Sequence, residues 1–145
     1  MAVIGLGYVG LPLAVALARH FEVVGFDVKA ARGAELQSGQ DSTLEVTPEE
    51  MAAVALRYTS DPADLTACKV FVVAVPTPIN ANRVPDLGPL VGASRHLGQH
   101  IGEGSVVVYE STVYPGLTEE ECVPLLEKGS GLACGKDFFV GYSPE

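Results

Sequence analysis

The chain has 145 residues, of which 48% are hydrophobic, and a formal net charge of −9. A chain of this length and composition can bury one ordinary hydrophobic core, so we expect a single domain. Its nine Lys and Arg residues are scattered singly, which argues against a DNA or RNA partner, because binding phosphates requires clustered positive charge. The sequence has no apolar run of about 18 residues and no basic leader with a cleavage site, so we expect a cytoplasmic protein without a membrane partner.

The three cysteines, Cys68, Cys122 and Cys134, lie far apart and form no CxxC pair. This spacing indicates neither a disulfide framework nor a structural zinc site. Cys68 directly precedes a predicted buried strand and Cys122 falls in a predicted helix, where neither would present its thiol to a site. We therefore expect all three to be reduced and structural, the alternative being that one of them is a nucleophile.

The beginning of the chain has the pattern of a complete βαβ unit. An apolar pair, Val3-Ile4, leads into the glycine-rich segment 5–10, and apolar residues then recur at helical spacing. The helix is expected to end near Arg19-His20, whose charges suit the negative end of a helix dipole. Residues 23–26 form a second apolar strand, and Asp27 follows it directly.

The alternation of strands and helices continues along the chain. We predict further helices over 30–37, from a capped start at Thr47, over 86–101, and from a capping box formed by Thr118 and Glu121, with a kink at Pro124. We predict further strands over 57–59, 69–75, 105–110 and 137–142. This order predicts an α/β fold: a doubly wound, mostly parallel Rossmann-type sheet with helices on both faces.

The segment Gly5-Leu6-Gly7-Tyr8-Val9-Gly10 has the GxGxxG spacing of a dinucleotide-binding turn. In such a turn Gly5 permits the tight bend, Gly7 lets a pyrophosphate approach the backbone, and Gly10 allows close helix packing. The spacing alone is weak evidence, because it also fits a merely tight strand-to-helix turn. Asp27, about 20 residues beyond the glycines, completes the fingerprint and favours nucleotide binding.

Asp27 also indicates which nucleotide is bound. A carboxylate at the end of the second strand accepts hydrogen bonds from the adenosine ribose and repels the 2′-phosphate of NADP, so we predict NAD. Lys29 and Arg32 lie close by in sequence and could instead bind that phosphate, as arginines do in NADP enzymes. The alternative for Arg32 is a solvated helix face.

Other candidate residues also have structural alternatives. His96 and His100 have the i, i+4 spacing of metal ligands, but no HExxH pattern accompanies them, so we expect them to face solvent and predict no metal site. Thr77 lies between two prolines and Thr112 follows a predicted strand, so either could be an ordinary hydroxyl or take part in chemistry. The same two readings apply to Glu145, as a plain carboxylate or a functional one.

Four motifs in order carry a resemblance to a known family. They are Gly5-Leu6-Gly7-Tyr8-Val9-Gly10-Leu11-Pro12-Leu13-Ala14, Val75-Pro76-Thr77-Pro78, Glu110-Ser111-Thr112-Val113-Tyr114-Pro115-Gly116 and Tyr142-Ser143-Pro144-Glu145. Together they resemble the UDP-glucose/GDP-mannose dehydrogenase family over the whole chain. The last two motifs look more like the branch that oxidises UDP-N-acetylhexosamines, such as UDP-GlcNAc or UDP-GalNAc, than like the UDP-glucose branch.

The resemblance implies a two-step oxidation of a sugar C6 alcohol to a carboxylate, which consumes two NAD and passes through a cysteine-bound thiohemiacetal and thioester. It also implies roles for individual residues. The cofactor would be contacted by Gly5, Gly7, Tyr8, Val9, Gly10, Asp27, Arg32, Thr77 and Thr112. Thr112 would help hold a catalytic water, and Glu145 would assist proton transfer and thioester hydrolysis.

In the resembled family, the nucleophilic cysteine, the dimer-forming central helix and the UDP-sugar-binding domain all follow the Ser-Pro-Glu motif. We therefore expect residues 1–145 to be the NAD-binding Rossmann domain of a longer, homo-oligomeric enzyme, inactive alone, and assign the nucleophile to no cysteine here. Two alternatives remain: another two-domain dehydrogenase, of the 6-phosphogluconate or hydroxyacyl-CoA type, and a non-catalytic NAD-sensing module. The sensor would be favoured if Thr112 and Glu145 lay far apart.

Overall fold

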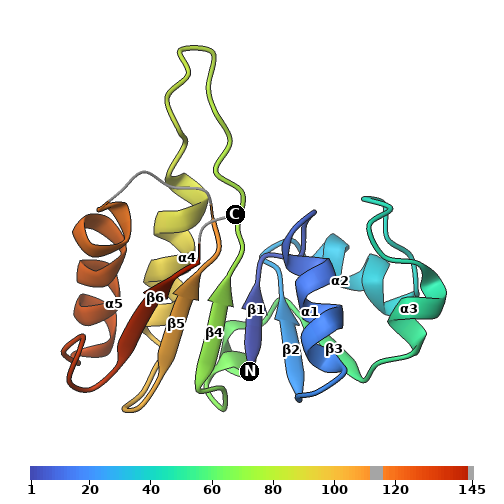
Figure 1. Cartoon of the computed structure of the whole chain (residues 1–145), viewed down its shortest axis with the longest axis horizontal. Coiled ribbons are helices and arrows are strands. Elements are labelled where there is room, and N and C mark those ends of the chain that lie inside the picture. The colour runs from blue at the N-terminus through green and yellow to red at the C-terminus, as the bar shows by residue number, and fades with distance from the viewer. Residues whose placement is uncertain (112–115, 144–145) are drawn as a thin grey trace.

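In the computed structural model, which describes residues 1–111 and 116–143, six parallel strands form one sheet (Figure 1). The strand order is β3-β2-β1-β4-β5-β6, the order of a doubly wound nucleotide-binding fold, so the predicted fold class is confirmed. The strands are β1 (Ala2–Ile4), β2 (Val23–Phe26), β3 (Leu56–Thr59), β4 (Val70–Val73), β5 (Val106–Tyr109) and β6 (Phe139–Tyr142).

Helices connect these strands and cover both faces of the sheet. In the described residues they are α1 (Gly10–Ala18), α2 (Ala30–Gln37), α3 (Pro48–Ala52), α4 (Gly88–Gly98) and α5 (Val123–Ser130), with a 3₁₀ turn η1 (Pro62–Leu65) and a π-helical turn η2 (Thr118–Cys122). The segment between β4 and α4 projects beyond the sheet as a long loop (Figure 1).

The central strands are buried on both faces. Successive side chains of a strand point to opposite sides, so Val3 joins the core beneath α1 and α2, whereas Ile4 joins the core beneath α4 and α5. This explains why the sequence of β4 is an unbroken apolar run. Leu11 of α1 and Leu97 of α4 are fully buried, and each contributes roughly 1.5–3 kcal/mol of apolar burial.

Several predicted elements are confirmed closely. Strand β2 and helix α2 have the predicted bounds, and Gly39, with φ +81°, follows α2. Thr47 caps the start of α3, as predicted: its hydroxyl accepts from the Glu50 N–H at 3.2 Å while the Glu50 carboxylate accepts from the Thr47 N–H at 2.8 Å, which is a capping box. Helix α4 is shorter than predicted: Asp86 stays outside it and accepts the Gly88 N–H at 2.9 Å.

The predicted capping box of Thr118 and Glu121 is wrong. Thr118 is buried within η2, and the residue that precedes this turn is Leu117, whose side chain makes no capping hydrogen bond. The Val123 N–H bonds back five residues to the Thr118 carbonyl, as in a π turn. Helical backbone continues from η2 into α5, and Pro124 is the second residue of α5, so its missing N–H falls where the π-type hydrogen bonding ends; the kink expected at Pro124 stays a prediction.

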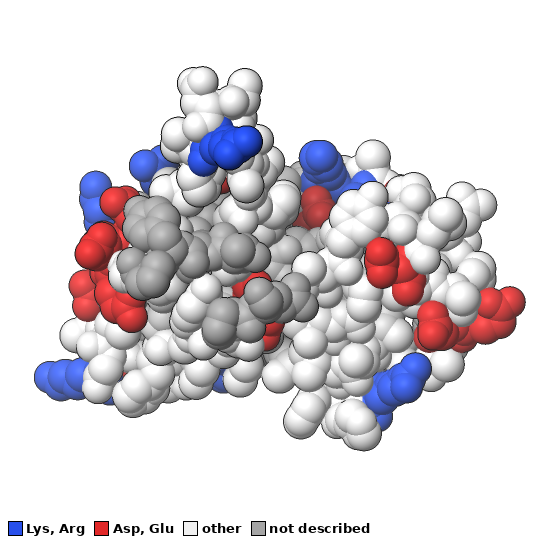
Figure 2. Space-filling view, turned by 45° about the horizontal axis from the view of Figure 1, so that its top comes forward, with Lys and Arg blue, Asp and Glu red and all other residues white. Residues whose placement is uncertain are grey.

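Acidic side chains gather in groups on the surface shown in Figure 2, whereas Lys and Arg side chains stand apart from one another.

Within the described residues, none of the helices combines the length and the apolar character needed to cross a membrane.

Candidate functional site

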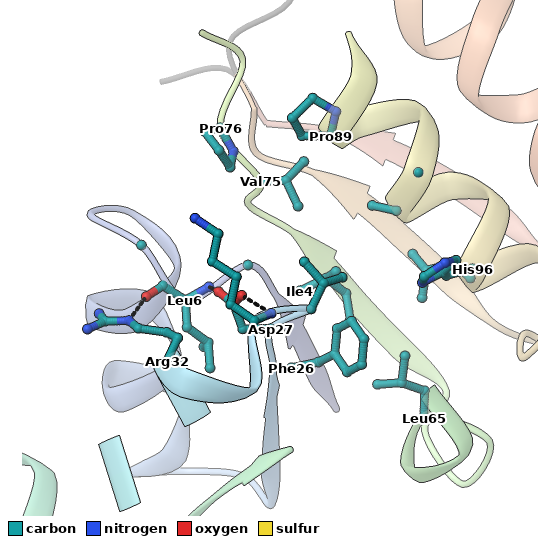
Figure 3. Close-up of a pocket in the computed structure, with 17 residues that line it drawn as sticks. Ile4, Leu6, Phe26, Asp27, Arg32, Leu65, Val75, Pro76, Pro89 and His96 are labelled. Carbon is teal, nitrogen blue, oxygen red and sulfur yellow. Dashed lines mark hydrogen bonds between the residues drawn. The ribbon is translucent and has the colours of Figure 1, made fainter. Parts of the chain in front are cut away.

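A cavity of about 520 Å³ lies at the carboxyl edge of the sheet, where β1, β2 and β4 end (Figure 3). Its walls are the glycine turn after β1, the residues that follow β2, the segment after β4, and one face of α4. The strand order reverses between β1 and β4, and doubly wound sheets bind ligands at this point.

The glycine turn packs tightly against the end of β4. Gly5 has φ +93°, and a Cβ there would lie 2.9 Å from the carbonyl oxygen of Ala74. A Cβ on Gly10 would lie 1.7 Å from the Gly5 carbonyl oxygen. A Cβ on Gly7 would have no atom within 4 Å. The fold itself thus requires glycine at positions 5 and 10, whereas the open backbone at Gly7 leaves room for a ligand.

Asp27 lies beside this turn, at the end of β2. One carboxylate oxygen accepts the Leu6 N–H at 3.1 Å, and the other accepts the Lys29 N–H at 2.9 Å (Figure 3). The half-buried carboxylate therefore links the glycine turn to the start of α2. A carboxylate has about four acceptor positions, so each oxygen can still accept a hydrogen bond from a ribose hydroxyl.

Arg32 lines the same cavity, and the alternative of a solvated helix face is wrong. Its side chain is only 10% exposed, and its Nε donates to the Leu6 carbonyl oxygen at 2.8 Å. Its two terminal nitrogens each lie 2.9 Å from a carboxylate, of Glu35 and of Asp41. The guanidinium is thus already engaged by protein groups on every nitrogen.

Asp41 is the residue of this network that sequence reasoning missed. Its carboxylate is fully buried and accepts hydrogen bonds from Arg32 and from the Thr43 hydroxyl and the N–H groups of Thr43, Glu45 and Val46. Burial raises its pKa, but these hydrogen bonds outweigh burial and hold the pKa at about 2. An Asp in a Gly-Gln-Asp-Ser-Thr run is typical of a turn, which predicts exposure and gives no sign of an Arg partner.

Apolar side chains line the part of the cavity farther from the glycine turn. Phe26, Leu65 and Val75 form this part with one face of α4, a shape and polarity suited to a flat aromatic base (Figure 3). His96 is exposed, as predicted, but also stands at the cavity rim. His100 is half-buried, with its Nδ1 3.2 Å from the Thr66 hydroxyl. The described residues contain no group of three His, Cys, Asp or Glu side chains arranged for a metal ion.

The cavity brings together some of the residues expected to bind a cofactor and leaves others outside its lining. Gly5, Gly7, Asp27 and Arg32 line it. Tyr8, Val9 and Gly10 belong to the same turn but not to the cavity wall, and Tyr8 is 69% exposed. Thr77 follows Val75 and Pro76, which do line the cavity.

Thr112 and Glu145, the two residues expected to act in catalysis, lie outside the described residues, so their roles stay predictions. Their neighbour Ser111 is buried, and its hydroxyl donates to the Val75 carbonyl oxygen at 2.7 Å. This bond ties the end of β5 to the cavity wall, directly before Thr112.

The cysteines are positioned as structural residues. Cys68 and Cys122 are buried and Cys134 is half-buried. Burial raises the pKa of the Cys122 and Cys134 thiols, which keeps them protonated and unreactive. None of the three lines the cavity.

The chain matches, over residues 1–145, the model described as "UDP-glucose/GDP-mannose dehydrogenase family, NAD binding domain". It is 57% identical to a UDP-N-acetyl-D-glucosamine 6-dehydrogenase of Pseudomonas aeruginosa, over all of this chain and 35% of that protein. It is 53% identical to a Salmonella typhi protein of the same name, over all of this chain and 34% of the relative. The chain thus spans about a third of the length of the curated relatives it matches.

Solved structures give the same result. A GDP-mannose dehydrogenase from Pseudomonas aeruginosa aligns with a TM-score of 0.90 at 32% identity, covering 99% of this chain and 35% of the other. An NDP-N-acetyl-D-galactosaminuronic acid dehydrogenase from Methanosarcina mazei aligns with a TM-score of 0.92 at 29% identity, covering 99% and 34%.

Proposed function

The chain belongs to the UDP-glucose/GDP-mannose dehydrogenase family and corresponds to the NAD-binding domain of that family. From this premise we propose that the intact protein is a nucleotide-sugar 6-dehydrogenase. It oxidises the C6 alcohol of a UDP-N-acetylhexosamine, UDP-GlcNAc or UDP-GalNAc, to a carboxylate. Each of the two oxidations transfers one hydride to one NAD, and water supplies the second carboxylate oxygen.

The observation that carries this proposal is the cavity between the glycine turn and Asp27, at the reversal point of the sheet. The carboxylate of Asp27 suits a ribose with two free hydroxyls, the apolar part of the cavity suits adenine, and the open backbone at Gly7 suits a pyrophosphate. In this arrangement Tyr8, Val9, Gly10 and Thr77 flank the cofactor.

The choice of sugar rests on the relatives. Those more than half identical to this chain include two UDP-N-acetyl-D-glucosamine 6-dehydrogenases, whereas the UDP-N-acetyl-D-mannosamine dehydrogenase of Pyrococcus horikoshii is 36% identical. UDP-GlcNAc is therefore the first substrate to test. The proposal further includes roles for Thr112 and Glu145 beside the reacting carbon, a sugar site and nucleophilic cysteine supplied from beyond this chain, and a cytoplasmic homo-oligomer.

The substrate is tested by following NADH formation by the intact protein with UDP-GlcNAc, UDP-GalNAc and UDP-glucose. We expect turnover with an N-acetylhexosamine, two NADH formed per sugar consumed, and a uronic acid product identified by mass spectrometry. One NADH per sugar, with an aldehyde or ketone as the product, would refute the two-step oxidation. Preference for UDP-glucose would refute the assigned branch.

The cofactor is tested by calorimetric titration of the intact protein with NAD⁺ and NADP⁺, alongside Asp27→Ala and a control. Glu22→Ala is a suitable control because it removes the same charge from an exposed site just before β2, at the opposite edge of the sheet. We expect NAD⁺ to bind to the wild type and the control, and the preference over NADP⁺ to be lost in Asp27→Ala. An unchanged preference in Asp27→Ala would contradict the role given to this carboxylate.

A further inference from the structure

The peptide groups on either side of Leu6 are held by two different side chains. The Leu6 N–H donates to Asp27 at 3.1 Å, and the Leu6 carbonyl oxygen accepts from Arg32 Nε at 2.8 Å (Figure 3). Leu6 lies between the first two glycines of the turn. The shape of the turn therefore depends on the end of β2 and on α2 as well as on its glycines.

Two carboxylates hold the Arg32 side chain in place. Its Nη1 lies 2.9 Å from Glu35 and its Nη2 lies 2.9 Å from Asp41. The Asp41 side chain is fully buried and that of Arg32 is 10% exposed, so this pair is largely shielded from water. Charge-assisted hydrogen bonds in such surroundings are strong and directional, so Arg32 has little freedom to turn toward another anion.

Asp41 is fixed by the loop that follows it. Three backbone N–H groups, of Thr43, Glu45 and Val46, and the Thr43 hydroxyl donate to its carboxylate. Within this loop Leu44 has φ +57°, a left-handed conformation that is unfavourable for a Leu and that these bonds help to maintain. The loop thus orients Asp41, and Asp41 orients Arg32.

This arrangement affects the electrostatics of the cofactor cavity. Among the described residues that line the cavity, Lys29 and Arg32 carry positive charge, and Lys29 is exposed. Glu35 and Asp41 both bind the Arg32 guanidinium, so their negative charges exceed its positive charge. A 2′-phosphate placed beside Asp27 would therefore meet a carboxylate, and Lys29 would be the one described cation of the cavity lining not already paired with carboxylates.

We propose that Asp41, which does not line the cavity, is a positioning and specificity residue for the cofactor: it holds Arg32 on the Leu6 carbonyl and withholds its guanidinium from the 2′-phosphate of NADP. This inference rests on NAD binding by the domain. It assigns the discrimination against NADP to two residues: Asp27 repels the 2′-phosphate, and Asp41 keeps the Arg32 guanidinium from binding it.

The test compares Asp41→Asn, Glu35→Gln and Glu45→Gln in the intact protein. All three remove one negative charge, but Glu45 is exposed in the same loop and its carboxylate is not part of the network, so it is the matched control. Dissociation constants for NAD⁺ and NADP⁺ are measured by calorimetry, and KM for the UDP-sugar and kcat with NAD⁺ by steady-state kinetics. Thermal unfolding midpoints are recorded in parallel.

We expect Asp41→Asn to reduce the preference for NAD⁺ over NADP⁺ by about tenfold, Glu35→Gln to reduce it by about threefold, and Glu45→Gln to leave it within about twofold. KM for the UDP-sugar should not change. If Asp41 had only a structural role, its substitution would weaken the binding of NAD⁺ and NADP⁺ by the same factor and leave the ratio of their dissociation constants unchanged. That result would overturn the inference. If Asp41→Asn does not fold, the ratio in Glu35→Gln decides by the same criterion.

Failure of the inference is distinguishable from failure of the proposed function. A wild-type protein that binds neither cofactor contradicts the function itself. A wild-type protein that prefers NAD⁺, with ratios unchanged in Asp41→Asn and Glu35→Gln, contradicts only the role of Asp41.

Discussion

Gly7 and Gly10 belong to one turn, but their hydrogen side chains are needed for different reasons. A Cβ on Gly10 would lie 1.7 Å from the Gly5 carbonyl oxygen, a contact that only a backbone shift can relieve. A Cβ on Gly7 would meet no atom within 4 Å. The fold therefore excludes a side chain at position 10, whereas at position 7 only the pyrophosphate of the proposed cofactor would exclude one.

We expect Gly10→Ala to lower the thermal unfolding midpoint sharply, with a destabilisation of about 3 kcal/mol or more, and to abolish NAD binding. Gly7→Ala should leave the midpoint nearly unchanged and weaken NAD binding about tenfold, because its methyl group occupies the path of the pyrophosphate. Differential scanning fluorimetry and calorimetry separate the two effects. A Gly7→Ala protein that binds NAD as tightly as the wild type would show that the pyrophosphate passes elsewhere.

The low pKa of Asp41 should also make the stability of the protein depend on pH in the acid range. Burial raises its pKa, but hydrogen bonds from Thr43, Arg32 and Val46 lower it from 3.8 to about 2, so the folded state binds the proton more weakly than the unfolded chain does. The resulting stability is present above pH 4 and is lost as the pH falls from about 4 to about 2.

Asp41→Asn, which cannot titrate, should therefore be less stable than the wild type at neutral pH, and the difference should narrow as the pH falls through this window. Urea unfolding at a series of pH values measures this directly, with Glu45→Gln as the control. A stability difference that stays constant down to pH 2 would contradict the low pKa.

Helices α4 and α5 meet through two glycines. A Cβ on Gly98 would lie 2.9 Å from the Leu125 carbonyl oxygen, and a Cβ on Gly129 would lie 2.8 Å from the Gly98 carbonyl carbon. Both obstacles are backbone atoms, so neither can rotate away. The close approach of the two helices therefore requires glycine on each side.

Gly98→Ala should separate α4 from α5 and cost about 1–3 kcal/mol. Gly92→Ala is the matched control in the same helix: its Cβ would meet no atom within 4 Å, so it should keep or raise stability, by up to about 1 kcal/mol, through better helix propensity. Chemical denaturation of the two variants measures the difference. Equal stability of the two variants would show that the helices tolerate the larger spacing.

The elements also show what a sequence can and cannot predict. Local sequence patterns predicted the bounds of β2 and α2 and the capped helix start at Thr47, because strand periodicity and capping involve residues close in the chain. They failed at Thr118, where the same capping pattern lies within a π turn just before Pro124. A pattern of residue types cannot tell which residue of a helix start faces the core.

The candidate site shows the same division. Gly5, Gly7 and Asp27 could be predicted because the fingerprint gives their spacing, and all three line the cavity. The surroundings of Arg32 could not, because its partners Leu6 and Asp41 lie 26 residues before and nine residues after it. Side chains joined by tertiary contacts leave no periodic signal in the sequence.

At the scale of the whole molecule, the cavity spans the two halves of the sheet. Ile4 and Phe26 line it from the half that contains β1 to β3, and Val75 and Leu97 line it from the half that contains β4 to β6. A ligand bound there contacts both halves at once. Its binding should therefore be linked to unfolding of the domain as a unit.

We expect NAD⁺ to raise the unfolding midpoint in proportion to the logarithm of its concentration, with a stabilisation of about 2.7 kcal/mol at one hundred times the dissociation constant. NADP⁺ at equal concentration should have a much smaller effect, and Asp27→Ala should remove the difference between the two. Scanning calorimetry over a concentration series measures the dependence. A midpoint that does not respond to a high concentration of NAD⁺ would mean that the folded protein does not bind this nucleotide.

The contact between the glycine turn and Ala74 has a consequence for synthesis on the ribosome. Ala74 donates its N–H to the Ile4 carbonyl at 2.8 Å, and the Gly5 backbone packs directly on the Ala74 carbonyl. A nascent chain that has emerged only as far as β3 contains every residue of the dinucleotide fingerprint but lacks the strand against which the turn takes its shape. We therefore expect the cofactor to bind only after β4 has inserted beside β1, and not to serve as a template for the first βαβ unit.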